Sequence, residues 1–172
     1  MLRAAICDDE IVILFHDEII YTRKCYGYTN NDNGELVIQP QEAGIVQLIF
    51  DMYLKGKSII GIKKELEKQR ILSPYGKEQW YNRTIDNILS NEKYVGDVIV
   101  FKTYTTGFPN QKRVKNSREK NKYLSAKSHP AIISRENFDA VKEEKLKRSN
   151  VIRDENGIKR KNTKYSSKKE NQ

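Results

Sequence analysis

The side chains best suited to chemistry on a partner molecule fall between residues 82 and 90. Ile85, Ile88 and Leu89 have helical spacing and would form the buried stripe of a short helix. The residues of that helix left facing outward are polar, namely Arg83, Thr84, Asp86, Asn87 and Ser90. Arginine can donate two hydrogen bonds to O6 and N7 of guanine, and asparagine can pair with N6 and N7 of adenine. These residue types predict a helix that reads bases in the major groove of double-stranded DNA. Lys77, in the preceding loop, and Asn82 are expected to contact DNA as well.

The positive charge of the chain is concentrated outside this helix. The 172 residues carry a net charge of +9, to which residues 102–127 contribute +7 and residues 146–172 contribute +6, while residues 23–101 come to +1. The cations of the first segment expected to contact phosphate groups are Lys102, Lys112, Arg113, Lys115, Arg118, Lys120 and Lys122. Phosphate contacts position a protein on DNA without specifying sequence, and they make its affinity fall steeply with salt. Solvated loops or tails are the alternative interpretation of both segments.

Three short helices are expected around the base-reading residues. The first covers about 41–55, with Pro40 in its first turn and a buried stripe at Ile45, Leu48, Ile49 and Met52. Ser58 would cap a second helix ending near Gln69, and Asn82 would cap the third. Trp80 is expected to pack at the base of the third helix. Three short helices, the last following a Pro/Gly loop, are the ingredients of a helix-turn-helix arrangement.

The remaining elements predict an α+β fold. Residues 26–38 read as a β-hairpin around an Asn-Gly turn, and the β-branched and aromatic run 94–101 reads as a strand. Residues 102–127 are expected to form a long loop or flexible arm, and residues 130–133 a short strand. Ser134 would cap a last helix, whose stripe is Phe138, Val141, Lys145 and Leu146. The polar, basic chain after residue 146 predicts disorder. The expected fold is thus a small helix-turn-helix-like core with a flanking hairpin, short strands and a basic arm.

A series of apolar, aromatic and glycine positions carries a family resemblance between residues 24 and 146. The positions are Tyr26, Gly27 and Tyr28, the return strand 34–38, Ala43, Ile45, Val46, Ile49, Phe50 and Tyr53, then Ile62, Leu66, Pro74, Trp80, Thr84, Ile85, Ile88, Leu89 and Asn91, then Tyr94, Val95 and Gly96, and last residues 129–134, Phe138 and Val141. In this order and spacing they resemble the recombinase domain of the large serine recombinases. These are site-specific integrases and transposases of phages and mobile elements.

The resemblance implies a module that binds one half of an attachment site, while a separate domain cuts and rejoins DNA. In that family the catalytic domain lies N-terminal to the module and supplies a serine nucleophile with supporting arginines, and a zinc ribbon with paired cysteines follows. Residues 1–25 contain no serine, the first serine is Ser58, and no cysteine pair follows residue 146. We therefore expect a fragment, a remnant or one part of a split gene, with no catalytic residue. Arg70 stands where family members commonly have glycine, and a left-handed backbone there would cost stability.

The first residues form a separate feature. Residues 1–10, ending in Asp8, Asp9 and Glu10, resemble the first strand and acidic cluster of response-regulator receiver domains, where paired acids bind Mg²⁺. The phospho-acceptor strand and the later lysine of a receiver are absent. We interpret this segment as a fusion scar or a coincidence.

Other residue types exclude several classes of protein. Cys7 and Cys25 are isolated, and His16 and His129 lack companions at ligand spacing, so no disulfide framework, metal site or cofactor is expected. The chain has no apolar run of membrane-spanning length and no secretory signal, so a cytoplasmic, nucleoid-associated bacterial protein with no membrane contact is expected. The expected division is an N-terminal segment over 1–22, a DNA-binding domain over 23–146 and a basic tail over 147–172.

The sequence leaves four functions open. The leading hypothesis is a non-catalytic, sequence-specific module of a serine recombinase whose partner is double-stranded DNA. The second is a free-standing regulator that competes with an intact recombinase for its sites. The third is a strand-exchange enzyme assembled with a separate catalytic domain or as a homo-oligomer on DNA. The fourth is a remnant that does not bind DNA.

Overall fold

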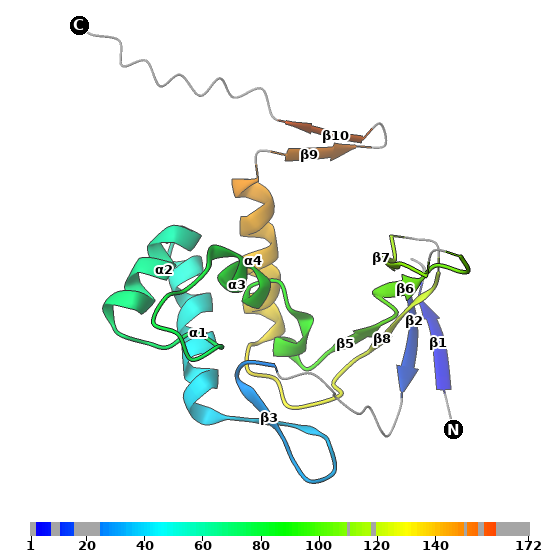
Figure 1. Cartoon of the computed structure of the whole chain (residues 1–172), viewed down its shortest axis with the longest axis horizontal. Helices are drawn as coiled ribbons and strands as arrows, with labels where there is room; N and C mark the ends of the chain where they lie inside the picture. The colour runs from blue at the N-terminus through cyan, green and yellow to red at the C-terminus, as the bar shows by residue number, and fades with distance from the viewer. Residues whose placement is uncertain are drawn as a thin grey trace, which may run out of the picture.

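The helices of the protein gather on one side and a small β-sheet lies on the other (Figure 1). The computed structural model describes residues 3–7, 11–15, 25–109, 111–117, 120–149, 151–154 and 157–160. Four α-helices and several short strands alternate along this part of the chain, so the fold is mixed α+β, as the sequence predicts. Helix α4 stands between the other helices and the sheet, and the hairpin of β3 projects beyond the end of α1.

The first two helices begin and end at the residues that the sequence marks. Helix α1 spans Pro40–Leu54, with Pro40 at its first position, where a missing N–H leaves no hydrogen bond unmade. Gly56, at φ +92°, reverses the chain after it. Helix α2 spans Ile59–Lys68, and the Ser58 hydroxyl accepts a hydrogen bond from the Gly61 N–H at 3.1 Å. Ile62 and Leu66 are its buried residues.

The buried face of α1 differs from the predicted stripe. Its buried residues are Ala43, Val46, Ile49, Phe50, Met52 and Tyr53. Ile45 and Leu48 are half-buried at the edge of the core. The prediction missed part of this face because α1 is apolar on most sides, and only the position of α4 decides which side is covered. Phe50 stacks on Phe138 of α4, with ring centroids 6.2 Å apart.

The C-terminal helix, α4, spans Arg135–Arg148, and the Ser134 hydroxyl caps it by accepting from the Asn137 N–H. Phe138 and Val141 are buried as predicted, whereas Leu146 is 73% exposed and does not belong to the core.

The strands form four separate sheets. Strands β3 (Tyr28–Asn30) and β4 (Leu36–Ile38) pair antiparallel and form the predicted hairpin. A four-stranded sheet has the order β1-β2-β8-β5, from β1 (Arg3–Cys7), β2 (Ile11–Phe15), β8 (Lys122–Ser125) and β5 (Val98–Val100). Strands β6 (Thr103–Thr105) and β7 (Arg113–Lys115) form a second hairpin. Strands β9 (Val151–Asp154) and β10 (Gly157–Arg160) pair in the segment predicted to be disordered.

The predicted strand over 94–101 is wrong in its first half. Residues Glu92–Val95 form a 3-10 helix, η1, which ends at Gly96 in a left-handed conformation with φ +83°. A Cβ atom at Gly96 would lie 2.6 Å from the His129 carbonyl oxygen, so only glycine fits this approach. The strand therefore begins at Val98. Local β-propensity is overridden here by the close packing of the following loop.

The predicted strand over 130–133 is also wrong. The N–H groups of Ile132 and Ile133 both donate to the Tyr94 carbonyl at 2.9 Å, and both side chains are buried. Their apolar character therefore serves the helical core and not a sheet. By contrast, the segment 102–127, predicted as a loop or flexible arm of a hairpin, contains β6, β7 and β8.

The N-terminal strands do not follow the receiver-like interpretation. Strand β1 pairs antiparallel with β2, and β2 pairs in parallel with β8, so these residues extend the sheet of the basic segment. The acidic residues 8–10 lie outside the described residues.

Candidate nucleic-acid interface

Helix α3, which spans Asn82–Ile88, rests on Trp80. The Trp80 side chain is fully buried, its indole Nε1–H donates to the Ile71 carbonyl at 2.8 Å, and its ring meets Tyr26 edge to face at 6.1 Å. The Trp80 backbone N–H also donates to Glu67 of α2 at 2.9 Å. These contacts fix the first turn of α3 against the end of α2, as predicted for a tryptophan packed at its base.

The start of α3 differs by one residue from the prediction. Tyr81 is the N-cap residue and makes no side-chain cap hydrogen bond, so Asn82 is the first helical residue and not the cap. Ile85, Ile88 and Leu89 are buried, as their spacing predicts. Asn82 is exposed because it does not fold back to cap the helix.

The polar residues of α3 fall into two groups. Arg83 and Asn87 are exposed and Thr84 is half-buried, and none of these side chains has a hydrogen bond or ion pair within the described residues. Asp86, in contrast, is held by Lys145 of α4, whose Nζ lies 2.5 Å from Asp86 Oδ1. This ion pair neutralises the acid. Helix α3 therefore presents one open side and one side whose charge is compensated.

Lys145 also satisfies the end of α3. Its Nζ donates to Ser90 Oγ at 2.5 Å and to the Asp86 carbonyl at 3.4 Å, and the Ser90 hydroxyl donates to the same carbonyl at 2.7 Å. Sequence reasoning did not assign Lys145 this role. No local signal could have shown it, because Lys145 and Asp86 are 59 positions apart.

A surface pocket of about 230 Å³ lies beside the open side of α3. Its lining residues are Cys25, Tyr26, Pro74, Tyr75, Thr84, Asn87, Ile88, Asn91, Lys93 and Tyr94. The wall opposite α3 comes from the loop between α2 and α3, where the Tyr75 side chain is 76% exposed. Burial is the main cause that raises the pKa of the Cys25 thiol, which keeps it protonated at neutral pH.

Lys77, predicted to contact DNA, lies in the same loop. Its carbonyl accepts from the Ser73 N–H at 2.8 Å and its N–H donates to the Ser73 hydroxyl at 3.3 Å, which closes a tight turn and leaves the lysine side chain exposed.

The β6–β7 hairpin carries cations of the predicted basic arm. Lys112, Arg113 and Lys115 are exposed, and Arg113 Nε donates to the Thr103 hydroxyl across the hairpin at 2.9 Å. The base of the hairpin is closed by Asn116, whose buried amide donates to the Phe101 carbonyl at 2.9 Å and the Lys120 carbonyl at 2.7 Å. Asn116 was not singled out from the sequence, because its importance depends on carbonyl groups on either side of the hairpin.

Other cations of the arm have partners within the protein. Lys102 forms an ion pair with Glu92 of η1. Lys120 Nζ lies 4.9 Å from the centroid of the Tyr104 ring, and Lys122 Nζ donates to the Ser117 carbonyl at 3.3 Å. Arg118 lies outside the described residues.

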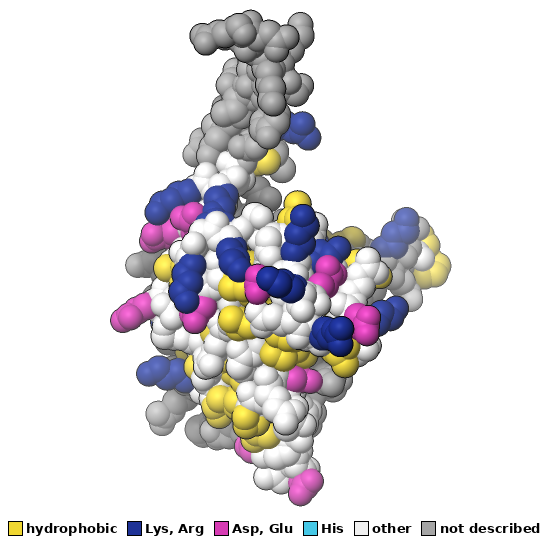
Figure 2. Space-filling view, turned by 90° about the vertical axis from the view of Figure 1, so that its left-hand side faces the viewer, with side chains coloured by type: hydrophobic (Ala, Val, Ile, Leu, Met, Phe, Trp, Pro, Cys, Tyr) yellow, Lys and Arg dark blue, Asp and Glu magenta, His cyan; other side chains and the backbone are white. Residues whose placement is uncertain are grey.

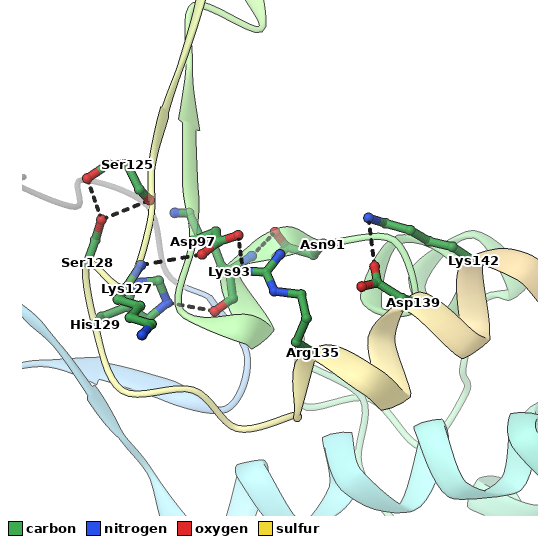
Figure 3. A network of polar contacts seen from close by, with 10 residues as sticks. All are labelled: Asn91, Lys93, Asp97, Ser125, Lys127, Ser128, His129, Arg135, Asp139 and Lys142. Carbon is green, nitrogen blue, oxygen red and sulfur yellow. Dashed lines mark hydrogen bonds and ion pairs between the residues drawn. The ribbon is translucent and has the colours of Figure 1, made fainter. Parts of the chain in front are cut away.

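A polar network joins the sheet to the helices (Figure 3). The carboxylate of buried Asp97 accepts from Arg135, at the start of α4, at 2.5 Å and from the Lys127 N–H at 3.4 Å. His129 Nε2 lies 2.6 Å from the Lys93 carbonyl. Burial is the main cause that lowers the pKa of His129. The network ties the loop after β8 to η1 and to α4.

The face formed by α1 and α2 mixes charges of both signs, as Figure 2 shows from that side. Cations of α2 have acidic neighbours there: Lys57 lies 3.2 Å from Glu65, and Lys63 lies 3.8 Å from Glu67. This face is therefore less suited to hold a polyanion than the hairpin, whose exposed cations are grouped.

Among the described residues, no group of three or more His, Cys, Asp or Glu side chains could hold a metal ion. No helix of this part of the chain is both long and apolar enough to span a membrane.

Comparison with known proteins identifies the family. Residues 40–148 match the family model described as Recombinase, so the chain belongs to the Recombinase family. It is 27% identical over 136 residues to a protein of Bacillus subtilis (strain 168) with the name "Putative DNA recombinase", and this match covers 73% of the chain but 27% of that protein.

Solved structures agree with this relationship. A crystal structure of an LSR–DNA complex matches with a TM-score of 0.50 and 25% identity, over 77% of this chain and 35% of that one. A structure from work on the sequence requirements of the Listeria innocua prophage attP site matches with a TM-score of 0.49 and 24% identity, over 77% of this chain and 46% of that one. The chain thus spans less than half the length of each of these relatives.

Proposed function

We propose that this chain is a non-catalytic, DNA-binding module of a serine site-specific recombinase, and that it binds an attachment site or element end in duplex DNA. The observation that supports this most directly is the open side of α3. Arg83, Thr84 and Asn87 offer base-reading groups without partners among the described residues, while the acid beside them is neutralised by Lys145. The Recombinase family and the similarity to an LSR–DNA complex support the choice of DNA as partner.

In this proposal α2 and α3 act as a helix-turn-helix pair. The second helix of such a pair enters the major groove and contacts base edges through its N-terminal residues. Arg83 would then contact guanine and Asn87 adenine, while Asn82 and Lys77 contact the adjoining backbone. The β6–β7 hairpin would hold phosphate groups through Lys112, Arg113 and Lys115, and these contacts add affinity without sequence preference.

Binding would be tested with the full chain and a duplex that it selects from a randomised library. The affinity for that duplex, compared with a random duplex at several salt concentrations, should be higher by on the order of a thousandfold, and both affinities should fall with salt. No selected sequence, and no gel shift at low salt, would contradict the proposal.

Base reading by α3 has a matched pair of variants. Arg83→Lys keeps the charge but loses the two-pronged geometry of the guanidinium group, whereas Arg83→Ala loses both. If Arg83 reads guanine, both variants should lose sequence preference, corresponding to about 1–3 kcal/mol, and Arg83→Lys should keep more of the binding to random duplex. Equal preference in Arg83→Lys and the wild-type chain would assign Arg83 to phosphate contact alone.

Catalysis would have to come from a separate domain in this proposal. A supercoiled plasmid that carries the selected site should stay unchanged with the full chain alone. Recombination should appear only when a resolvase-type serine catalytic domain is added, as a partner or within a homo-oligomer on DNA. Strand cleavage by the full chain alone would show that it carries its own nucleophile. A role on bacterial DNA would place the protein in the cytoplasm.

A further inference from the structure

The pocket beside α3 combines two kinds of surface in a space that fits the edge of a base pair. One wall is polar and comes from α3, where Thr84 and Asn87 have no side-chain partner within the described residues. The opposite wall comes from Pro74 and Tyr75 of the loop that leads into α3. The floor is formed by side chains that the core already holds, among them Ile88 and Tyr94.

The exposure of Tyr75 is a feature that packing does not explain. Its side chain is 76% exposed, although tyrosine is a large and largely apolar residue, and its hydroxyl has no hydrogen bond within the described residues. It stands next to the exposed Lys77, and Arg83 follows on α3. Aromatic surface between cations fits a partner that is negatively charged at its backbone and apolar at points of its surface, as duplex DNA is.

We propose that this pocket reads an A·T base pair, with the Asn87 amide on adenine and the Pro74–Tyr75 wall against the 5-methyl group of thymine. In the major groove this pair presents the acceptor N7 and the N6 amino donor of adenine beside the thymine methyl group. Asn87 can satisfy both adenine groups with its own donor and acceptor. The inference rests on the proposed function and adds the class of base pair recognised.

The same pocket would discriminate against a G·C pair. Guanine presents two acceptors, O6 and N7, and the single NH₂ group of Asn87 leaves its own oxygen facing an acceptor. Cytosine has no 5-methyl group, so the Pro74–Tyr75 wall would lose its apolar contact. Both parts of the pocket thus favour the same base pair, which is the reason to assign them together.

The test uses two single-atom or single-group changes in the selected duplex. Replacing one thymine at a time by deoxyuridine removes only the methyl group, and replacing one adenine at a time by 7-deazaadenine removes only the N7 acceptor. At the pair read by the pocket, the full chain should lose about fourfold in affinity for the missing methyl group and about tenfold for the missing N7.

Two variants assign these losses to their residues. Tyr75→Ser should bind the thymine and uracil duplexes equally but keep the 7-deazaadenine loss, whereas Asn87→Ala should show the reverse. Tyr81→Ser is the matched control, because Tyr81 is also exposed and near the start of α3 but does not line the pocket. It should keep both losses. Thermal unfolding of the three variants checks that each is folded at the assay temperature.

The outcomes separate this inference from the proposed function. If the full chain selects no duplex, the proposed function fails. If it selects a duplex but Tyr75→Ser keeps the full uracil loss, or Asn87→Ala keeps the full 7-deazaadenine loss, only the A·T inference is overturned. The same holds if no thymine or adenine in the selected site is sensitive to either replacement.

Discussion

Helix α3 and the β6–β7 hairpin present polar groups to the surface in different ways. Helix α3 is fixed by a buried tryptophan and carries few free groups, because Lys145 neutralises the acid on one side of the helix. The hairpin carries exposed cations on two short strands and is closed at its base by Asn116. A rigid support suits the directional hydrogen bonds that distinguish bases, whereas phosphate attraction needs charge more than fixed geometry. The two regions should therefore respond differently to the same kinds of perturbation.

The largest effect is expected where α3 meets its support. Trp80→Ala should lower the free energy of unfolding by about 3–5 kcal/mol, because a fully buried ring and its hydrogen bond to Ile71 are lost. Urea denaturation followed by circular dichroism measures this. The neighbouring Tyr81→Ala is the control, and it should change stability by less than about 0.5 kcal/mol, since Tyr81 is exposed. A small effect of Trp80→Ala would show that α3 does not depend on this support.

The hairpin should control the salt dependence of DNA binding. Replacing Lys112, Arg113 and Lys115 together by Gln should make the slope of log affinity against log salt shallower by about 2–3. Fluorescence anisotropy should show affinity falling about tenfold to a hundredfold for selected and random duplexes alike. A control with the same charge change is the triple variant of Lys55, Lys64 and Lys68 to Gln, which are exposed cations of the α1–α2 face. An equal change in both triple variants would assign the slope to net charge and not to the hairpin.

Arg70 offers a way to stabilise the helical region without touching the hairpin. Its backbone has φ +54°, the left-handed conformation predicted for this position, and its side chain is exposed. Arg70→Gly should therefore raise the free energy of unfolding by about 1 kcal/mol, because glycine adopts this conformation without strain. Lys68→Gly, inside α2, should instead lower it by about 1 kcal/mol. Destabilisation by Arg70→Gly would mean that the arginine side chain makes a contact worth more than the strain.

The Lys145–Asp86 ion pair should act on DNA binding as well as on stability. The coupling between Lys145→Met and Asp86→Asn in a double-mutant cycle should be about 0.5–1 kcal/mol in the free energy of unfolding, since both side chains are partly exposed. Lys145→Met alone should weaken DNA binding, because it leaves the Asp86 charge uncompensated beside phosphate groups. Adding Asp86→Asn should restore the affinity. A double variant that binds as weakly as Lys145→Met would assign Lys145 a direct contact with DNA.

The junction between the two regions should respond to pH through His129. Its folded-state pKa is lowered by burial, so below about pH 6.5 the unfolded chain binds a proton that the folded chain resists. Stability should be fully present above that pH and fall as the pH decreases toward the folded-state pKa. Melting temperatures of the wild-type chain and of His129→Gln, measured from about pH 7 to about pH 5.5, check this. An equal decrease in the variant would assign the pH dependence to other groups.

The sequence predicted the elements that depend on local signals. The bounds of α1, α2 and α4 follow Pro40, Ser58 and Ser134, whose effects on the first turn of a helix are local. The hairpin of β3 and β4 follows its Asn-Gly turn. The left-handed backbone of Arg70 was predicted from the resemblance to a family in which glycine is common at this position.

The errors arose where distant segments decide the outcome. Residues 94–96 have strand-like side chains, but the His129 carbonyl packs so closely that Gly96 turns the chain. Residues 130–133 are apolar like a strand, yet their N–H groups bind the Tyr94 carbonyl. A pattern of residue types holds no information about such contacts.

Residue types alone thus determined that this chain has an α+β fold, a polar face on a short helix and a strongly basic segment after it. They also carried the resemblance by which the Recombinase family was expected. Only the tertiary structure decided which of those polar groups are free. Asp86 is paired by a lysine 59 positions away, and Tyr75 is brought opposite Asn87 across a pocket. Charge compensation and pocket shape depend on distances in space, and the order of residues along the chain does not specify those distances.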